Sequence, residues 1–218
     1  MRSVSLAIIG AGTAGITAYK EARRHSEEVV LIEGGPGGTT CARVGCMPSK
    51  ALIAAAEAVH GADWLHRRGL AGPPGSVDSA AILERVRSLR DDFAAGPAGM
   101  LEELGDRAIR QHARFLEPGL LELADGERLR AEAVILATGS EPVVPDHWPE
   151  LGNRLLTSDT LFEQRKLPAR LAVVGLGAIG LELGQALARL GVAVTGFEIG
   201  DRLGDLGDAA VSEAARTA

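Results

Sequence analysis

Two copies of one glycine-rich turn constrain what this sequence can fold into more than any other feature. The first copy runs from Gly10 to Gly15 and the second from Gly175 to Gly180, with glycine at the first, third and sixth position of each. A short apolar run precedes each copy, as Val4–Ile9 and as Leu171–Val174. Because such a run is typical of a buried parallel strand, the repeat predicts a strand, a tight turn and a helix, twice.

An acidic residue completes each copy. Glu33 follows Gly10 by 23 residues and Glu198 follows Gly175 by the same interval. The first glycine of such a motif permits the tight turn, the second lets the backbone approach a pyrophosphate, and the third lets the helix pack closely on the strand. The helix N-terminus offers N–H groups to the phosphates, and the carboxylate accepts hydrogen bonds from ribose hydroxyls. The sequence therefore predicts two dinucleotide sites; the alternative, a glycine-rich turn without a ligand, carries more weight for the second copy.

The charge at the end of the second copy bears on which nicotinamide dinucleotide it would take. A carboxylate at Glu198 repels a 2′-phosphate and so favours NAD over NADP. Arg202 lies nearby, and its positive charge would favour NADP instead. The sequence predicts NAD on balance.

Composition narrows the class of protein. The chain has 218 residues and a formal charge of −6, with basic residues scattered rather than clustered, which argues against nucleic-acid binding. No apolar run is long enough to predict a membrane-spanning helix. The apolar stretch Leu6–Ile16 is interrupted by glycines and fits a strand and turn better than a secretion signal. A cytoplasmic, reducing location is expected, where two cysteines are more often catalytic or redox-active than structural.

The remaining pattern alternates short apolar runs with helical periodicity, which is typical of an α/β fold. Further strands are expected at Val29–Ile32, Ile109–Phe115, Leu120–Leu123, Ala133–Ala137 and Val192–Phe197. Helices are expected over Met47–His60 and from Asp78 onward. The predicted fold class is α/β: a Rossmann-like nucleotide-binding domain over residues 1–145, then the start of a second over residues 146–218. The proline-bearing stretch Pro142–Pro149 resembles a linker between them.

The second signal is the segment from Gly38 to Lys50, which holds both cysteines of the chain, Cys41 and Cys46. A metal site needs more ligands and the five histidines show no ligand pairing, so no metal is expected. Two unrelated buried thiols remain an alternative. A redox pair fits best, because Cys46 lies just before a predicted helix whose N-terminus favours a thiolate, and Lys50 adds a positive charge one turn later. A thiolate of low pKa is the chemistry that dithiol–disulfide exchange needs.

The run from Cys41 to Lys50, with Gly45 and Pro48-Ser49 in place, resembles the active-site motif of the class I pyridine nucleotide–disulfide oxidoreductases. The resemblance covers essentially the whole chain, because Ala137–Ser140 and the second glycine turn lie in the order that the family shows. Members are FAD flavoproteins such as dihydrolipoamide dehydrogenase, glutathione reductase and mercuric reductase. Residues 39–43 are most similar to the dihydrolipoamide dehydrogenase branch. The other two types, and an inactive flavin- or nucleotide-binding fragment, are the alternatives.

The resemblance implies that the first glycine turn binds the ADP half of FAD and that the second binds NAD(H). For FAD it implies contacts from Gly10, Gly12, Thr13, Ala14, Gly15, Glu33, Gly38, Thr39, Thr40, Lys50, Ala113, Ala137, Thr138 and Gly139. For NAD it implies contacts from Gly175, Gly177, Ala178, Ile179, Gly180 and Glu198. Two positions depart from the family pattern. Gln111 stands where a glycine is usual, and Ala178 stands where some relatives carry a tyrosine over the flavin.

The resemblance also implies four catalytic residues. Cys46 would be the charge-transfer thiol next to the flavin, and Cys41 the interchange thiol that meets the substrate sulfur. Lys50 and Glu182 would form an ion pair near the flavin N5, although a solvated helix face is the alternative for Glu182. The implied substrate is a small dithiol or disulfide, or a lipoyl group.

The family's general base is a histidine, oriented by a glutamate, on a C-terminal interface domain that the partner subunit of a homodimer supplies. The His-Pro…Glu segment that carries this base is not found among the 218 residues, and only two strands are predicted for the second nucleotide domain. We therefore expect the N-terminal portion of an oxidoreductase, without its dimer-forming domain. Little or no turnover is expected of this portion alone.

Overall fold

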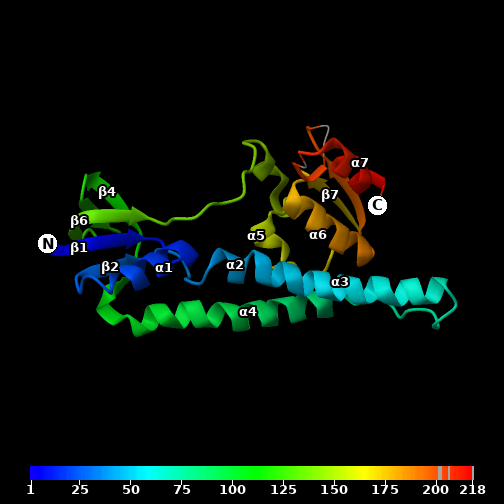
Figure 1. Ribbon diagram of the computed structural model, residues 1–218, viewed down its shortest axis with the longest axis horizontal. Helices are drawn as coiled ribbons and strands as arrows, with labels where there is room; N and C mark the ends of the chain where they lie inside the picture. The colour runs from blue at the N-terminus through cyan, green and yellow to red at the C-terminus, as the bar shows by residue number, and fades with distance from the viewer. Residues whose placement is uncertain (201–202, 206, 218) are drawn as a thin grey trace. The chain divides into compact units, whose positions relative to one another are not determined.

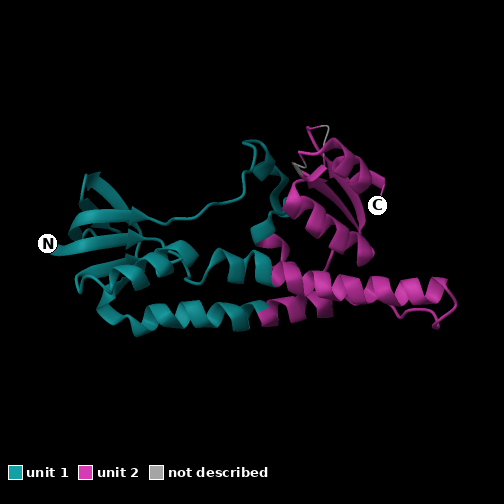
Figure 2. Cartoon of the chain, viewed as in Figure 1, with its two compact units in different colours: residues 1–47, 90–159 teal, residues 48–89, 160–218 magenta. Residues whose placement is uncertain are grey.

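The computed structural model describes residues 1–200, 203–205 and 207–217. Two compact units are present, and each is built from two stretches of the chain (Figure 2). Unit 1 comprises residues 1–47 and 90–159, and unit 2 comprises residues 48–89 and 160–218. Two long helices, α3 (Cys46–Arg67) and α4 (Ser79–Glu103), contribute residues to both units. The domain limits at residue 145 remain a prediction.

Unit 1 is built on a six-stranded sheet in the order β3-β2-β1-β6-β5-β4 (Figure 1). The strands are β1 (Arg2–Ile9), β2 (Val29–Ile32), β3 (Ala108–Ile109), β4 (Ala113–Glu117), β5 (Leu120–Leu123) and β6 (Arg128–Leu136). The pairs β1–β2, β1–β6 and β2–β3 are parallel, while β4, β5 and β6 form an antiparallel edge. All four residues of β2 are buried, as expected for a strand in the interior of a parallel sheet.

The α/β fold class predicted from the sequence is confirmed, and most predicted elements are present. Two of them are longer than predicted: β6 starts at Arg128 rather than Ala133, and α3 continues to Arg67 rather than ending at His60. One predicted strand is wrong because it is divided in two. The run Ile109–Phe115 is divided between β3 and β4, because residues 110–112 carry the chain from one edge of the sheet to the other. The β5–β6 hairpin turns at the predicted Asp125-Gly126, where Gly126 has a positive φ of 86° and donates its N–H to the Leu123 carbonyl at 2.9 Å.

Helix α1 (Thr13–Ala22) packs its apolar side on the sheet of unit 1. Tyr19 of this helix is buried with Ile8 and Leu31 from the strands and with Leu101 from α4. Short helices η1 (Gly105–Arg107) and η2 (Trp148–Arg154) complete the unit. This core fixes the helix N-terminus next to the ends of β1 and β2.

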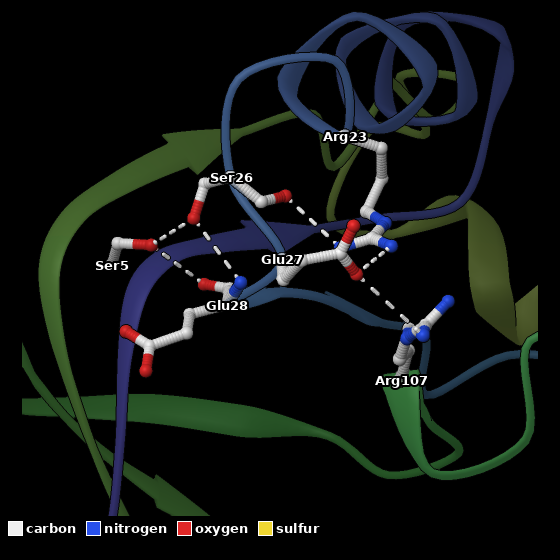
Figure 3. Close-up of polar contacts among 6 residues, drawn as sticks. All are labelled: Ser5, Arg23, Ser26, Glu27, Glu28 and Arg107. Carbon is white, nitrogen blue, oxygen red and sulfur yellow. Dashed lines mark hydrogen bonds and ion pairs between the residues drawn. The ribbon is translucent and has the colours of Figure 1, made fainter.

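A polar network holds the connection between α1 and β2 (Figure 3). Ser26 bonds to Ser5 at 2.7 Å between their hydroxyl oxygens and accepts the Glu28 N–H at 3.1 Å. Arg23, largely buried, donates to the Ser26 carbonyl at 3.0 Å and forms an ion pair with Glu27. β2 starts directly after this network, at Val29, and ends at Ile32, one residue before Glu33.

Unit 2 contains a two-stranded parallel sheet of β7 (Arg170–Val174) and β8 (Ala193–Phe197), joined by α6 (Ala178–Arg189) (Figure 1). Short elements flank it: η3 (Leu203–Asp205), α7 (Ala209–Thr217) and the second half of α5 (Ser158–Leu161), whose first two residues belong to unit 1. Within this unit Arg87 of α4 donates to the carbonyls of Phe162 and Gln164 at 3.2 and 2.7 Å. Asp78 caps α4 as predicted, accepting the N–H groups of Ala80 and Ala81 at 3.0 and 3.1 Å. Among the described helices, none combines the length and apolarity needed to cross a membrane.

Candidate functional site

The first glycine turn has the backbone geometry that its three glycines suggest. Gly10 has a φ of 101°, in the left-handed region, and a side chain there would overlap the carbonyl of Ala137. A side chain on Gly15 would overlap the carbonyl oxygen of Gly10. Gly12 is different, because no atom lies within 4 Å of the position its Cβ would take. The turn therefore has no room for a side chain at its first and third glycine. It has room at the second, Gly12, just before the N-terminus of α1.

The carboxylate of Glu33 links this turn to the loop that follows β2. It accepts the N–H of Ala11 at 2.7 Å through Oε2 and the N–H of Gly35 at 2.7 Å through Oε1. A carboxylate has about four acceptor positions, so both oxygens keep capacity for further donors. Glu33 is thus held rigidly at the end of β2 and can still accept ribose hydroxyls.

A cleft of about 510 Å³ opens in front of the turn, and all its lining residues belong to unit 1. It brings together nine of the residues predicted for the first nucleotide: Gly10, Gly12, Glu33, Gly38, Thr40, Ala113, Ala137, Thr138 and Gly139. The other four of unit 1 lie behind this lining. Thr13, Ala14 and Gly15 form the first turn of α1, and Thr39 caps the short helix α2 (Thr40–Arg43) by accepting the Ala42 N–H at 3.1 Å.

Sequence reasoning gave no role to several other lining residues. They are Ile9, Ile32, Gly34, Gly35, Pro36, Gly37, Arg43, Val44, Gln111, His112, Ser140 and Asp159. The imidazole of His112 lies against Gly34, so closely that a side chain on Gly34 would overlap it. The sequence does carry a signal for the loop at residues 34–38, because glycine takes four of these five positions directly after Glu33. No sequence signal brings Asp159 to the cleft; the tertiary fold does.

The two cysteines lie at one end of this arrangement. Cys41 is in the first turn of α2, and Cys46 is the exposed first residue of α3. The sulfurs are present as thiols rather than as a disulfide, and they share a hydrogen bond. That bond to Cys46, together with burial, raises the pKa of the Cys41 thiol.

The second glycine turn, in unit 2, repeats the geometry of the first. Gly175 has a φ of 91°, and a side chain on Gly180 would overlap the Gly175 carbonyl oxygen. Glu198 accepts the N–H of Leu176 at 2.6 Å through Oε2 and that of Ile199 at 2.8 Å through Oε1. These backbone N–H groups, Leu176 foremost, hold the pKa of the Glu198 carboxyl below its usual value.

The other residues predicted for the second nucleotide surround that turn. Gly177 is the N-cap of α6, and Ala178, Ile179 and Gly180 form its first turn. The Ile179 side chain is exposed. Arg202, which weighs on the choice between NAD and NADP, lies outside the described residues.

Lys50 and Glu182 are brought together within unit 2, as the predicted ion pair requires. Lys50 Nζ donates to Glu182 Oε1 at 2.7 Å, and their side chains are 61% and 36% exposed. The hydrogen bond from Lys50, the largest cause, holds the pKa of the Glu182 carboxyl below its usual value of 4.5. Among the described residues no group of three or more His, Cys, Asp or Glu side chains gathers as a metal site would require.

The low pKa of Glu182 predicts a pH dependence of stability. A carboxyl with a depressed folded-state pKa stabilises the fold above its unfolded pKa of 4.5, and the effect is lost as the pH falls through the folded value. Glu182→Gln should therefore lower the free energy of unfolding by about 1 kcal/mol or less at pH 7, because the pair is solvent-exposed. Urea unfolding at pH 7 and below 4.5 checks this.

The matched control for that experiment is Glu84→Gln, an exposed position on α4 for which the described residues provide no ion pair. It should leave the unfolding free energy unchanged at both pH values. An equal loss for Glu182→Gln at neutral and acid pH would contradict the proposed electrostatic origin.

Comparison with known proteins decides the family. Residues 4–218 match the pyridine nucleotide-disulphide oxidoreductase family. The chain belongs to this family.

Two kinds of curated protein are similar to this chain: mercuric reductases and dihydrolipoyl dehydrogenases. A mercuric reductase of Streptomyces lividans is 39% identical over 190 residues, which are 84% of this chain and 40% of the relative. A dihydrolipoyl dehydrogenase of Pseudomonas aeruginosa is 38% identical over 189 residues, again 84% and 40%. A mercuric reductase of Lysinibacillus sphaericus is 34% identical over 181 residues, which are 33% of its length. The chain thus spans two fifths or less of these relatives.

Solved structures support the fold of this family member. The HOCl-induced flavoprotein disulfide reductase RclA from Escherichia coli matches 98% of the chain with a TM-score of 0.80 and 23% identity, over 46% of its own chain. Its Cu(II) complex matches 97% with a TM-score of 0.79 and 24% identity. At this identity the likeness shows a shared fold.

Proposed function

We propose that this chain is the FAD- and NAD-binding portion of a dithiol–disulfide oxidoreductase. One observation carries the proposal: the open Gly12 turn, the Glu33 carboxylate and the residues around Cys41 all border a single cleft. Family membership supports the same conclusion. The finer assignment is a dihydrolipoyl dehydrogenase type, which the relative from Pseudomonas aeruginosa supports. Mercuric reductases match equally well and give the second candidate.

The residues of unit 1 fit FAD. Gly12 offers open backbone next to the helix N-terminus for the pyrophosphate, and Glu33 keeps acceptor capacity for the ribose. Thr138 and Gly139 would border the same ligand from the end of β6, where Gly139 has a positive φ of 75°. When bound, FAD would accept two electrons from the cysteine pair and pass them as hydride to NAD⁺.

The cysteines would carry out the exchange with substrate. In the oxidised state, a substrate thiolate attacks Cys41, so a substrate–Cys41 disulfide forms, the Cys41–Cys46 bond breaks and Cys46 leaves as thiolate. The second substrate thiolate then attacks the mixed disulfide and releases Cys41. The substrate leaves as a disulfide, and the two electrons remain on the cysteine pair. Cys41 is released as a thiolate, and its raised pKa favours the uptake of a proton at its sulfur.

Unit 2 would bind the nicotinamide dinucleotide. Its glycine turn repeats that of unit 1, and the Glu198 carboxylate, bonded to the Leu176 N–H of that turn, would repel a 2′-phosphate. We therefore propose NAD(H) as the dinucleotide.

A spectroscopic titration tests the proposed function. The purified chain should bind added FAD stoichiometrically, and the loaded protein should show a long-wavelength absorption band after two-electron reduction. NADH should reduce the bound flavin at a lower concentration than NADPH, by about tenfold or more, because of Glu198. Dihydrolipoamide and Hg²⁺ assays then separate the two candidate types. A protein that takes up no FAD would refute the proposed function.

A further inference from the structure

An arginine between the two cysteines lies along the wall of the nucleotide cleft. Arg43 is the last residue of α2 and lines the cleft together with Gly38, Thr40 and Val44. Its aliphatic stem lies over Gly38: a Cβ on that glycine would lie 3.0 Å from Cδ and 3.2 Å from Cγ of Arg43. Gly38 thus leaves the space that the arginine stem occupies.

The charge of Arg43 has no counterpart within the part of the chain that the structure describes. No described residue forms a hydrogen bond or an ion pair with its guanidinium, whereas Arg23, Arg114 and Arg130 each pair with a carboxylate. Two carboxylates line the same cleft, and both have other partners. Glu33 accepts two backbone N–H groups, and Asp159 accepts the Ser158 hydroxyl at 3.2 Å.

An arginine that is partly buried and lines a cleft is suited to one kind of ligand. Its planar donors match the oxygens of a phosphate, and bidentate pairs of this kind are among the stronger hydrogen bonds in proteins. The same cleft is lined by Gly12, where the space beside the backbone would let a pyrophosphate approach. The cleft therefore has two sources of positive potential, the N-terminus of α1 and Arg43.

We propose that Arg43 pairs with the pyrophosphate of the dinucleotide bound in this cleft and strengthens its binding. The proposal rests on the proposed function, because FAD is the dinucleotide assigned to unit 1. Arg43 would act as a ligand-binding residue located between the redox cysteines, so the segment that carries the dithiol chemistry would also hold the cofactor.

The experiment compares FAD with riboflavin, which has the flavin ring but no phosphate. Binding is followed by flavin fluorescence for wild type, Arg43→Ala and Arg43→Lys, at low and high salt. Arg43→Ala should weaken FAD binding about tenfold to a hundredfold and leave riboflavin binding unchanged. Arg43→Lys should lose less than Arg43→Ala. The salt dependence of FAD binding should be steeper for wild type than for Arg43→Ala.

Arg110→Ala is the matched control. Arg110 also approaches a glycine of this loop, with Nη1 3.4 Å from the position of a Cβ on Gly37, but it does not line the cleft. Its replacement should leave FAD binding unchanged. The proposal is overturned if Arg43→Ala binds FAD as wild type does, or if it weakens riboflavin equally, which would indicate a structural role. A wild-type chain that binds no FAD would instead overturn the proposed function and this inference together.

Discussion

Replacing Gly15 by alanine is expected to lower the free energy of unfolding by about 3 kcal/mol or more. The reason is local: the new methyl group would overlap the backbone carbonyl oxygen of Gly10, a residue that is held in place because its N–H donates to the Ile32 carbonyl at 2.8 Å. For a chain of this size the midpoint of thermal unfolding should fall by about 6–12 °C. Differential scanning calorimetry measures the effect.

Substitutions at two other glycines distinguish an effect on packing from an effect on ligand binding. Gly12→Ala should leave the fold intact, because Gly12 has a φ of −74° and open space around it, but should weaken FAD binding about tenfold to a hundredfold. Gly61→Ala, in an exposed helical position with no atom within 4 Å, should stabilise the chain by about 0.5–1 kcal/mol. If Gly15→Ala were as stable as Gly12→Ala, the closed turn described above would be wrong.

Replacing Cys46 by serine is expected to abolish reduction of the FAD-loaded chain by a dithiol, by about a thousandfold or more, because the disulfide that accepts the electrons cannot form. The same loss is expected for Cys41→Ser. The two variants should differ in their spectra. Cys41→Ser keeps the Cys46 thiolate and should show a long-wavelength band with oxidised flavin, whereas Cys46→Ser should not.

Each cysteine variant serves as the control for the other, because the chain has no third cysteine. Anaerobic mixing with dihydrolipoamide measures the flavin reduction in a single turnover. A long-wavelength band in Cys46→Ser and none in Cys41→Ser would reverse the roles proposed for the two thiols.

Much of the site was predictable because it rests on local backbone requirements. A turn that needs a positive φ at Gly10 and a close approach at Gly15 leaves a glycine pattern that any reader of the sequence can find. The interval to Glu33 is also local, because it is the length of one helix and one strand. The second copy repeats these requirements and the same interval at Gly175, Gly180 and Glu198.

The parts that were missed depend on contacts between distant segments. The predicted strand at residues 109–115 failed because the change from parallel to antiparallel pairing depends on β5 and β6, not on the run itself. Asp159 reaches the cleft through the order of strands and loops, for which its neighbours in sequence give no signal. Arg43 was visible within the cysteine motif, but the packing of its stem over Gly38 was not.

By itself the sequence determined that this chain has two nucleotide turns and a cysteine pair. Glycines at this fixed spacing are compatible with few other backbone conformations, and two thiols five positions apart fit few other kinds of chemistry. Tertiary structure alone decided which further residues share a cleft with them. It placed Asp159 around the same hollow as Gly12 and Glu33, and it laid the stem of Arg43 over Gly38. The physical reason is that hydrogen bonds and charge pairs between distant segments depend on how strands and helices pack, which no local pattern encodes.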